Sequence, residues 1–227
     1  NVGGRFCLSK PGFGNLIKQL CLDDYIVIGP ILKDECIVYG QITSIENLPW
    51  GITDKQEAGT YKTIRSKKNL AFEYVVGPDS VKSILFPKRE KIWSASIAGG
   101  KLNFHDGTPF QQDDQNLKTS KYAFLGLRSC ELKALQIQDD VFINSDKNAK
   151  TICTTYSIKR KESLIISVQC IKSEATCFCS STNTGPQAES GFDLAITEIP
   201  SDSSDDQDPW YHIQIGSKAG LKIAKIL

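Results

Sequence analysis

The sequence predicts an α/β protein of mixed α+β character, with an N-terminal α+β lobe followed by a strand–helix–strand lobe that contains a partly parallel sheet. Two continuous apolar runs, Tyr122–Leu127 and Leu164–Val168, have the length and composition of strands that are buried on both faces. Between them, Cys130–Asp139 carries apolar residues at helical spacing. Alternation of buried strand, helix and buried strand is typical of a parallel sheet covered by helices.

The N-terminal lobe is expected to combine short helices with β-rich runs. Gly14–Leu22 has its apolar residues on one side of a helix, and Tyr25–Ile28 is a β-rich run that the turn signal Gly29-Pro30 should end. Asp79 or Ser80 can cap a short helix that Pro87 stops. The further elements expected in this lobe are strands over Ile37–Tyr39, Tyr61–Ile64 and Phe72–Val76 and that capped helix over Val81–Leu85.

The polar stretch Ala98–Ser120 contains Gly99-Gly100 and predicts a hairpin followed by a connection. We place a lobe boundary there, giving lobes 1–112 and 113–227, with one continuous domain as the alternative. In the second lobe, Ser129 is expected to cap the helix Cys130–Asp139. The remaining expected elements are strands over Phe192–Ile199 and Trp210–Ile215, the solvated acidic loop Ser201–Asp208 and a helical segment over Ser217–Leu227.

Composition narrows the class of protein. Hydrophobic residues make up 40% and charged residues 23% of the 227 residues, as in ordinary globular proteins. The formal charge of +1 gives no field that would attract nucleic acid, and no apolar stretch is long enough to span a bilayer. A chain of this length with eight cysteines and regular apolar strands does not resemble a small disulfide scaffold, so we expect a reducing, cytoplasmic location.

Cys130, Cys170, Cys177 and Cys179 form the most informative set of residues. Cys130 and Cys170 each follow a buried strand, and Cys177-Phe178-Cys179 opens a polar loop. If the two strands are parallel, their carboxyl ends lie at one edge of the sheet, where ligands collect. Four thiols at one edge suit a centre of a soft metal, such as an iron–sulfur cluster, zinc or copper(I).

The residues alone leave three interpretations open. Structural zinc sites usually contain Cys-x2–4-Cys pairs, which are absent here, whereas iron–sulfur clusters accept scattered spacings. Ser180 and Thr184 can supply hydrogen-bond donors to sulfur, and Arg128 can offset an anionic cluster. The alternatives are a structural zinc site and thiols that are either redox-active or purely structural.

The other candidate residues carry weaker signals. The two histidines, His105 and His212, lack ligand-like spacing, and we expect no catalytic residue on this chain. The remaining cysteines are interpreted as buried structural residues, because free cysteine is among the most buried residue types. They are Cys7, Cys21, Cys36 and Cys153.

Four segments resemble the β subunit of the sulfhydrogenases (soluble nickel–iron hydrogenases) and its relative in anaerobic sulfite reductase. The likeness spans nearly the whole chain, and its most specific parts are the last two of these segments. The segments are Gly40–Lys62, Gly77–Trp93, Phe124–Phe142 with its Arg-Ser-Cys motif, and Cys177–Glu198 with its Cys-Phe-Cys motif.

The resemblance implies an electron-transfer subunit whose iron–sulfur clusters link a flavin subunit to a catalytic subunit. Carried over residue by residue, it makes Cys130, Cys170, Cys177 and Cys179 cluster ligands. The chain departs from that family in having Thr182 where many relatives carry methionine. It also lacks the C-terminal ferredoxin-like Cys-x2-Cys-x2-Cys-x3-Cys runs, so we expect either an N-terminal part of such a protein or a reduced relative with one centre.

Together, the residues and the resemblance predict an iron–sulfur electron-transfer domain of a multisubunit cytoplasmic oxidoreductase, holding one [4Fe–4S] cluster on four cysteines. Isolated from its partners, it is expected to transform no substrate. A structural zinc module for assembly and a thiol redox sensor are the competing hypotheses.

Overall fold

A seven-stranded mixed sheet forms the centre of the chain in the computed structural model, which describes residues 1–89, 93–106, 121–143, 153–201 and 208–227. The spatial order of the strands is β1-β11-β10-β9-β8-β2-β3. Strands from the first and last thirds of the chain therefore lie side by side. Their bounds are β1 Arg5–Ser9, β2 Tyr25–Lys33, β3 Cys36–Gln41, β8 Lys121–Leu127, β9 Leu164–Val168, β10 Leu194–Ile199 and β11 Trp210–Ile215.

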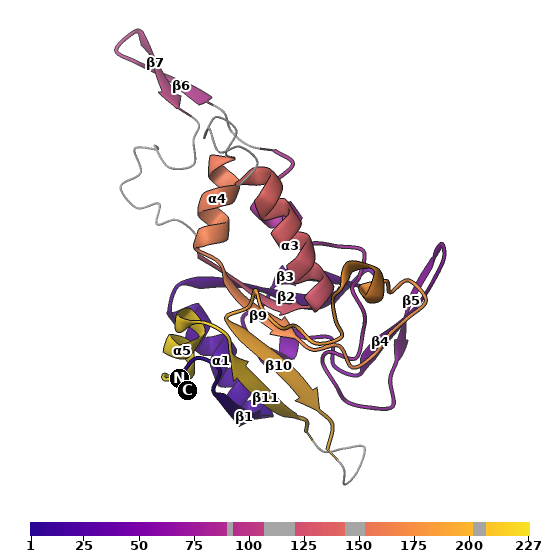
Figure 1. Ribbon diagram of the computed structural model, residues 1–227. Helices are drawn as coiled ribbons and strands as arrows, with labels where there is room; N and C mark the ends of the chain where they lie inside the picture. The colour runs from indigo at the N-terminus through magenta and orange to yellow at the C-terminus, as the bar shows by residue number, and fades with distance from the viewer. Residues whose placement is uncertain (90–92, 107–120, 144–152, 202–207) are drawn as a thin grey trace.

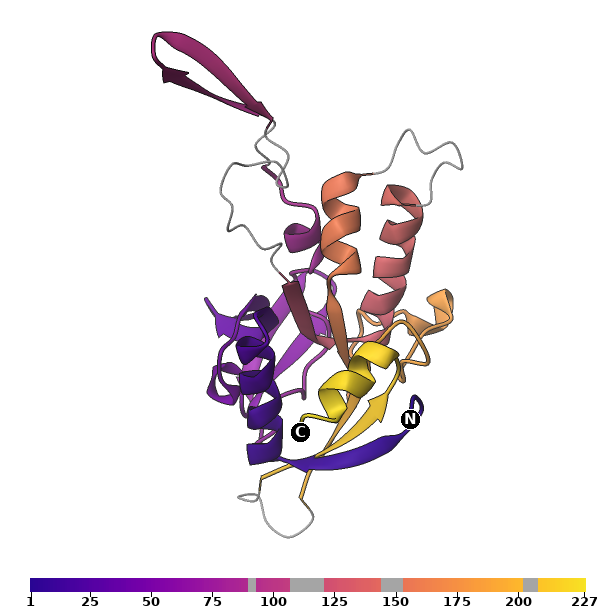
Figure 2. The ribbon, with the colours of Figure 1, turned by 90° about the vertical axis from the view of Figure 1, so that its left-hand side faces the viewer.

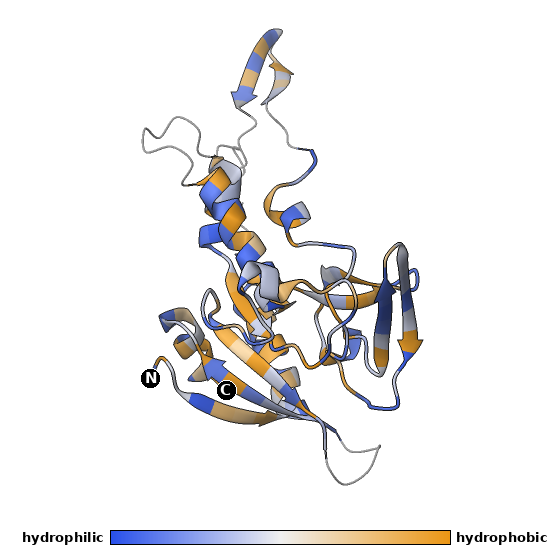
Figure 3. Cartoon of the chain, turned by 45° about the vertical axis from the view of Figure 1, so that its right-hand side comes forward, coloured by the Kyte–Doolittle hydropathy of each residue, from blue (hydrophilic) through white to orange (hydrophobic). Residues whose placement is uncertain are grey.

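The inner strands confirm the predicted parallel arrangement. β2, β8, β9 and β10 run parallel to one another, with Ile28 opposite Phe124 and Phe124 opposite Ile165. The outer pairs, β2 with β3 and β11 with both β10 and β1, are antiparallel. Figure 3 shows hydrophobic residues along the inner strands, as expected for strands covered on both faces.

Helices cover both faces of this sheet (Figure 1). α1 (Lys10–Leu22) and α5 (Lys218–Ala224) pack on one face, where Phe13, Leu16 and Ile223 join a core with residues of β8, β9 and β10. α2 (Lys82–Leu85), α3 (Ser129–Phe142) and α4 (Thr154–Lys161) pack on the other face, against a second core that contains Leu132 and Leu85. The chain is therefore a three-layer α/β structure, which confirms the predicted fold class.

Most of the predicted elements form, and some differ in extent. α1 begins four residues before the expected Gly14, because Ser9 caps it by accepting a hydrogen bond from Gly12 N. β2 does not end at Gly29-Pro30 as expected but runs to Lys33. Pro30 is tolerated because the pairing of β2 with β8 ends at Ile28, so the proline lies beyond that ladder.

Two hairpins stand apart from the central sheet. β4 (Ile52–Glu57) pairs with β5 (Thr60–Arg65), and β6 (Trp93–Ala98) pairs with β7 (Lys101–Asp106). Gly99 and Gly100 both have positive φ, which a tight hairpin turn requires. This pair confirms the predicted hairpin, which projects away from the body in Figure 2.

Phe72–Val76, which was expected to be a strand, has irregular structure. Its backbone groups bond to buried side chains instead of to a neighbouring strand. Glu198 accepts from the N–H groups of Ala71 and Phe72, both at 2.8 Å. Asp54 accepts from Val75 N, and Arg128 donates to the carbonyls of Phe72 and Tyr74. A composition rich in β-forming residues indicates that a segment lies in an apolar environment. In this segment, hydrogen bonds to charged side chains take the place of hydrogen bonds to a neighbouring strand.

The sequence patterns did not indicate β1, β4 or α4, because each is short or lacks a clear apolar period. The expected lobe boundary at residues 112 and 113, part of the connection after the hairpin and most of the loop 201–208 lie outside the described residues. No helix in the described ranges is long and apolar enough to cross a membrane.

Candidate metal centre

Cys130 is the second residue of α3, immediately after the inner strand β8. β8 carries a register irregularity between Leu125 and Leu127, and Gly126 there has φ +97°. Such bulges bend a strand and redirect the side chains that follow. The chain then leaves the sheet through Arg128 and enters α3 at the carboxyl edge of the parallel strands.

The start of α3 differs from the expectation that Ser129 caps the helix. Arg128 occupies the N-cap position, and the carboxylate of Glu131 accepts a hydrogen bond from Arg128 N at 2.8 Å. The Tyr39 hydroxyl donates to both oxygens of the same carboxylate, at 2.8 and 2.9 Å. Burial raises the pKa of Glu131 to about 6, against the lowering effect of these hydrogen bonds.

Cys170 lies two residues after β9, at the same edge of the sheet as Cys130. Its N–H donates to Pro186 O at 3.1 Å, and Ala188 N donates to the side chain of Gln169 at 2.7 Å. These bonds hold the segment 186–188 against the end of β9. The prediction that β8 and β9 deliver both cysteines to one edge is confirmed.

Cys177 and Cys179 come from the loop that follows β9. Cys179 begins the 3-10 helix η2 (Cys179–Thr182), which contacts α3, and the turn lies beside that helix in Figure 1. Cys177 is exposed, and its sulfur accepts from Glu174 N at 3.4 Å. The loop therefore returns to the first turn of α3, as the topology argument expected.

At Gly185 this loop packs closely against the start of α3. A Cβ atom at this position would lie 2.8 Å from Ser129 Oγ and 3.3 Å from Cys179 Sγ. Its φ of +49° is also a conformation that side chains rarely adopt. Only glycine fits here without displacement, and the sulfur of Cys179 and the hydroxyl of Ser129 thus lie against the same residue.

Two of the four thiols, Cys130 and Cys170, have raised pKa values. The pKa of the Cys130 thiol is raised to about 12, first by burial and then by Glu131, Cys170 and Cys179. Burial also raises the pKa of Cys170, with Cys179 and Cys177 adding to the effect and Arg128 opposing it. Both thiols are therefore protonated at neutral pH in the metal-free chain.

Arg128 supplies a buried positive charge at this edge. It is 1% exposed, and its guanidinium donates to three main-chain carbonyls, those of Gln169 at 2.9 Å, Phe72 at 2.7 Å and Tyr74 at 3.0 Å. The guanidinium also lies 4.8 Å from the centre of the Tyr74 ring. Carbonyl oxygens do not neutralise a cation, and the charge of Arg128 opposes the effect of burial on the pKa values of Glu131, Glu198 and Cys170.

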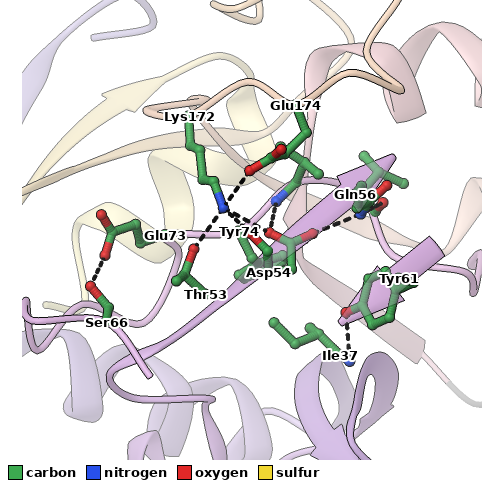
Figure 4. Close-up of polar contacts among 12 residues, drawn as sticks. Ile37, Thr53, Asp54, Gln56, Tyr61, Ser66, Glu73, Tyr74, Lys172 and Glu174 are labelled. Atoms are coloured by element: carbon green, nitrogen blue, oxygen red, sulfur yellow. Dashed lines mark hydrogen bonds and ion pairs between the residues drawn. The ribbon is translucent and has the colours of Figure 1, made fainter. Parts of the chain in front are cut away.

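The loop between Cys170 and Cys177 is tied to the hairpin β4–β5 by a buried polar cluster (Figure 4). Lys172 Nζ donates to Thr53 Oγ1 at 2.9 Å and forms ion pairs with Asp54 at 3.4 Å and Glu174 at 2.8 Å. It also donates to the main-chain carbonyl of Asp54. The side chain of Asp54 is fully buried, so its carboxylate depends on this lysine for charge compensation.

This cluster has no signature in the sequence. Lys172 and Asp54 are 118 positions apart, and neither residue lies in a recognisable motif. The sequence offers one indirect signal. Asp54 follows Ile52 and Thr53 in a segment with β-forming residues, and a carboxylate in such a segment needs a partner if it is buried.

The two hydroxyl residues predicted to donate to sulfur lie close by but are placed differently. Ser180 is exposed, and the hydroxyl of Thr184 bonds with Thr182 Oγ1 at 2.9 Å and with Cys179 O at 3.5 Å. These contacts stabilise the η2 turn. The expectation that Ser180 and Thr184 tune a cluster remains a prediction.

The four cysteines outside the set were expected to be buried. That expectation is wrong for Cys7, which is exposed on the edge strand β1. Cys21, Cys36 and Cys153 are partly buried, and Cys21 and Cys153 pack against the two cores.

Two cavities border the site. A groove of about 830 Å³ between α3 and residues 180–191 is lined by Ser129, Thr184 and Gly185 near the thiols and by Lys133 and Arg160 farther along α3 and α4. A smaller cavity of about 320 Å³ is lined by Cys170 with Arg5 and His212. Solvent and partner molecules can therefore reach the vicinity of the thiols.

All eight cysteines are free thiols. Within the part of the chain that the structure describes, no three His, Cys, Asp or Glu side chains are arranged as a ready-made metal site. The four candidate thiols are thus neighbours at one sheet edge whose sulfur atoms do not converge on a single point.

Comparison of the chain with protein-family models, with curated proteins and with solved structures finds no match.

Proposed function

We propose that this chain is an iron–sulfur electron-transfer domain that holds one [4Fe–4S] cluster on Cys130, Cys170, Cys177 and Cys179. The observation that carries the proposal is geometric: Cys130 and Cys170 follow the parallel strands β8 and β9 at one edge of the sheet, and the η2 turn that begins at Cys179 contacts α3 there. Soft sulfur donors in this number suit iron–sulfur chemistry, and a buried cation beside them suits an anionic centre.

The residues of the chain have distinct parts in this proposal. Cys130 and Cys170 come from the ends of rigid strands, whereas Cys177 and Cys179 come from the loop held by Lys172 and Gly185. Drawing the sulfurs together requires an adjustment of that loop, and the exposed position of Cys177 allows it. Metal binding must also displace the protons of Cys130 and Cys170, so binding strengthens as the pH rises.

When bound, such a cluster supplies a one-electron acceptor and donor. Arg128 would stabilise its negative charge from the buried side, while the exposed side at Cys177 leaves a short path to the surface for electron exchange. The resemblance suggests that electrons come from a reduced flavin subunit and pass to a catalytic subunit, in a cytoplasmic oxidoreductase of the hydrogenase or sulfite-reductase type.

The test is metal analysis of protein purified without oxygen. We expect four iron and four sulfide per chain, as the definition of the cluster requires, a brown colour, and a paramagnetic signal after one-electron reduction. The variant Cys179→Ser should lose or convert the cluster, whereas the exposed Cys7→Ser, outside the set, should match the unchanged protein.

The competing hypotheses give different results in the same experiment. Stoichiometric zinc in a colourless, redox-silent sample would support a structural zinc module. Metal-free protein in which Cys177 or Cys179 forms a reversible disulfide would support a thiol redox sensor. Equal iron content and spectra in Cys179→Ser and the unchanged protein would remove Cys179 from the ligand set.

A further inference from the structure

Two buried side-chain atoms directly before Cys130 have no hydrogen-bond partner among the described residues: Arg128 Nε and Ser129 Oγ. Ser129 is only 7% exposed. A buried hydroxyl without a partner destabilises the fold, and native proteins rarely leave such a group without a structural or chemical reason. The position of Ser129 therefore calls for an acceptor that none of the described residues provides.

The hydroxyl of Ser129 is unpaired because another residue performs the capping that serine normally does. A serine before a helix usually accepts a hydrogen bond from the first turn, but here the helix starts one residue earlier and Arg128 is the N-cap. Glu131 satisfies Arg128 N through its carboxylate. Ser129 therefore lies in the first turn of α3 with its hydroxyl free to donate elsewhere.

The surroundings of this hydroxyl indicate where it can donate. Ser129 Oγ and Cys179 Sγ both lie against the position where a Cβ of Gly185 would stand, at 2.8 and 3.3 Å from it. Ser129 is also the residue before Cys130 and lines the groove between α3 and residues 180–191. Ser129 Oγ and Cys179 Sγ thus border the same point beside Gly185, and an adjustment of the loop on metal binding can bring a sulfur atom of the centre within reach of the hydroxyl.

We propose that Ser129 donates a hydrogen bond from its hydroxyl to a sulfur atom of the centre, either a cysteine sulfur or an inorganic sulfide, and so raises the reduction potential of the centre. The proposal rests on the iron–sulfur function proposed above. Reduction adds negative charge to the sulfurs, so a hydrogen bond stabilises the reduced form more than the oxidised form. Arg128 acts in the same direction through its charge, whereas Ser129 acts through one directed bond.

The decisive variant is Ser129→Ala, which removes the hydroxyl with almost no change in volume. We expect iron and sulfide contents equal to those of the unchanged protein and a midpoint potential shifted to a more negative value. Pulsed electron paramagnetic resonance of the reduced protein in H₂O and D₂O should also show the loss of one exchangeable proton coupled to the cluster. The matched control is Ser190→Ala, an exposed serine that lines the same groove and should change neither measurement.

A second variant covers the case in which Ser129→Ala disturbs the first turn of α3. Ser129→Thr keeps the hydroxyl, so its potential should lie closer to that of the unchanged protein than the potential of the alanine variant does. Equal shifts in the two variants would overturn the proposal, because the effect would then be structural. An unchanged potential and proton coupling in Ser129→Ala would also overturn it.

These outcomes separate the two proposals. An unchanged protein that binds no iron and sulfide removes the iron–sulfur function, and the role of Ser129 falls with it. A loaded cluster whose potential does not depend on Ser129 leaves the function intact and removes only this inference.

Discussion

Arg128 combines two properties that rarely coincide, because its guanidinium is almost completely buried and yet bonds to neutral carbonyl groups. A buried cation without a directly bonded carboxylate is costly unless a nearby anion compensates for it. The pKa of Cys170 is lowered by Arg128 against the larger effect of burial. The guanidinium therefore keeps the pKa of Cys170 lower than burial alone would make it.

Replacing this charge should change the reactivity of Cys170 in the metal-free chain. In Arg128→Met, the pKa of Cys170 should rise further, because the cation that favours its thiolate is gone. At neutral pH the thiolate fraction falls, so alkylation of Cys170 by iodoacetamide, followed by mass spectrometry, should be severalfold slower.

The control for that measurement is Arg128→Lys, which keeps the charge. Circular dichroism should establish that both variants are folded, since the loss of hydrogen bonds to three carbonyls also lowers stability. Equal alkylation rates in the methionine and lysine variants would show that the charge does not control Cys170.

At the scale of single residues, the sequence indicated that thiols lie at the end of the parallel strands, but it did not indicate which residue caps the helix beside them. The residue types of Cys130, Cys170, Cys177 and Cys179 predict a group of thiols at one edge, and the parallel strands place Cys130 and Cys170 there. Ser129 was assigned to capping, because its position before an apolar helix is typical of an N-cap. In the structure, the carboxylate of Glu131 accepts the hydrogen bond from Arg128 N at the start of the helix. The same carboxylate also accepts a hydrogen bond from Tyr39, which lies on the distant strand β3.

At the scale of elements, the loop that carries Cys177 is held by β4. Lys172 reaches across to Asp54, whose side chain is fully buried and which also accepts hydrogen bonds from Val75 N and Gln56 Nε2. One carboxylate thus joins the loop after β9, the strand β4 and the irregular segment after β5. The loop after β9 is therefore held to the hairpin β4–β5 at Lys172, while Cys177 and Cys179 follow farther along it.

Breaking this pair should destabilise the fold near the thiols. In Lys172→Met, the Asp54 carboxylate stays buried without its cation, which we expect to lower the free energy of unfolding by roughly 1–3 kcal/mol. Urea unfolding followed by fluorescence measures this difference.

Lys55→Met provides a matched comparison, because the Lys55–Glu57 pair has both side chains more than 60% exposed. Exposed pairs contribute little, so this variant should lose at most about 0.5 kcal/mol. Similar losses of unfolding free energy in the two variants would show that the buried Lys172–Asp54 pair stabilises the fold no more than an exposed pair does.

At the scale of the whole molecule, charged side chains join parts of the chain that the sheet does not connect. Glu198 on β10 is 2% exposed and accepts hydrogen bonds from Ala71 N and Phe72 N, and the Tyr211 hydroxyl donates to it at 3.3 Å. Through these hydrogen bonds, Glu198 holds the segment after β5 against the central sheet. Burial raises the pKa of this carboxyl above its ordinary value of 4.5, against the lowering effect of the hydrogen bonds.

The raised pKa predicts a pH dependence of stability with a definite sign. The folded chain holds the proton of Glu198 more tightly than the unfolded chain, so this group favours folding most below pH 4.5. Its contribution falls as the pH rises through the folded pKa. The difference in unfolding free energy between the unchanged protein and Glu198→Gln should therefore become less favourable to the unchanged protein as the pH rises above 4.5.

Urea unfolding of both proteins over a pH series provides the measurement, and all other ionisable groups cancel in the difference. A difference that grows in favour of the unchanged protein with rising pH would contradict the prediction. It would mean that the N–H groups of Ala71 and Phe72 outweigh burial.

By itself, the sequence determined the fold class, the buried parallel strands, the helices with clear apolar faces and the presence of thiols at strand ends. These follow from residue type and local periodicity, which act over a few positions. Only the tertiary structure decided that 72–76 is held by side chains, that Lys172 neutralises Asp54 and that Ser129 and Cys179 both lie against Gly185. These arrangements join residues far apart in sequence, and they form because burial forces each polar group to find a partner wherever the fold places one.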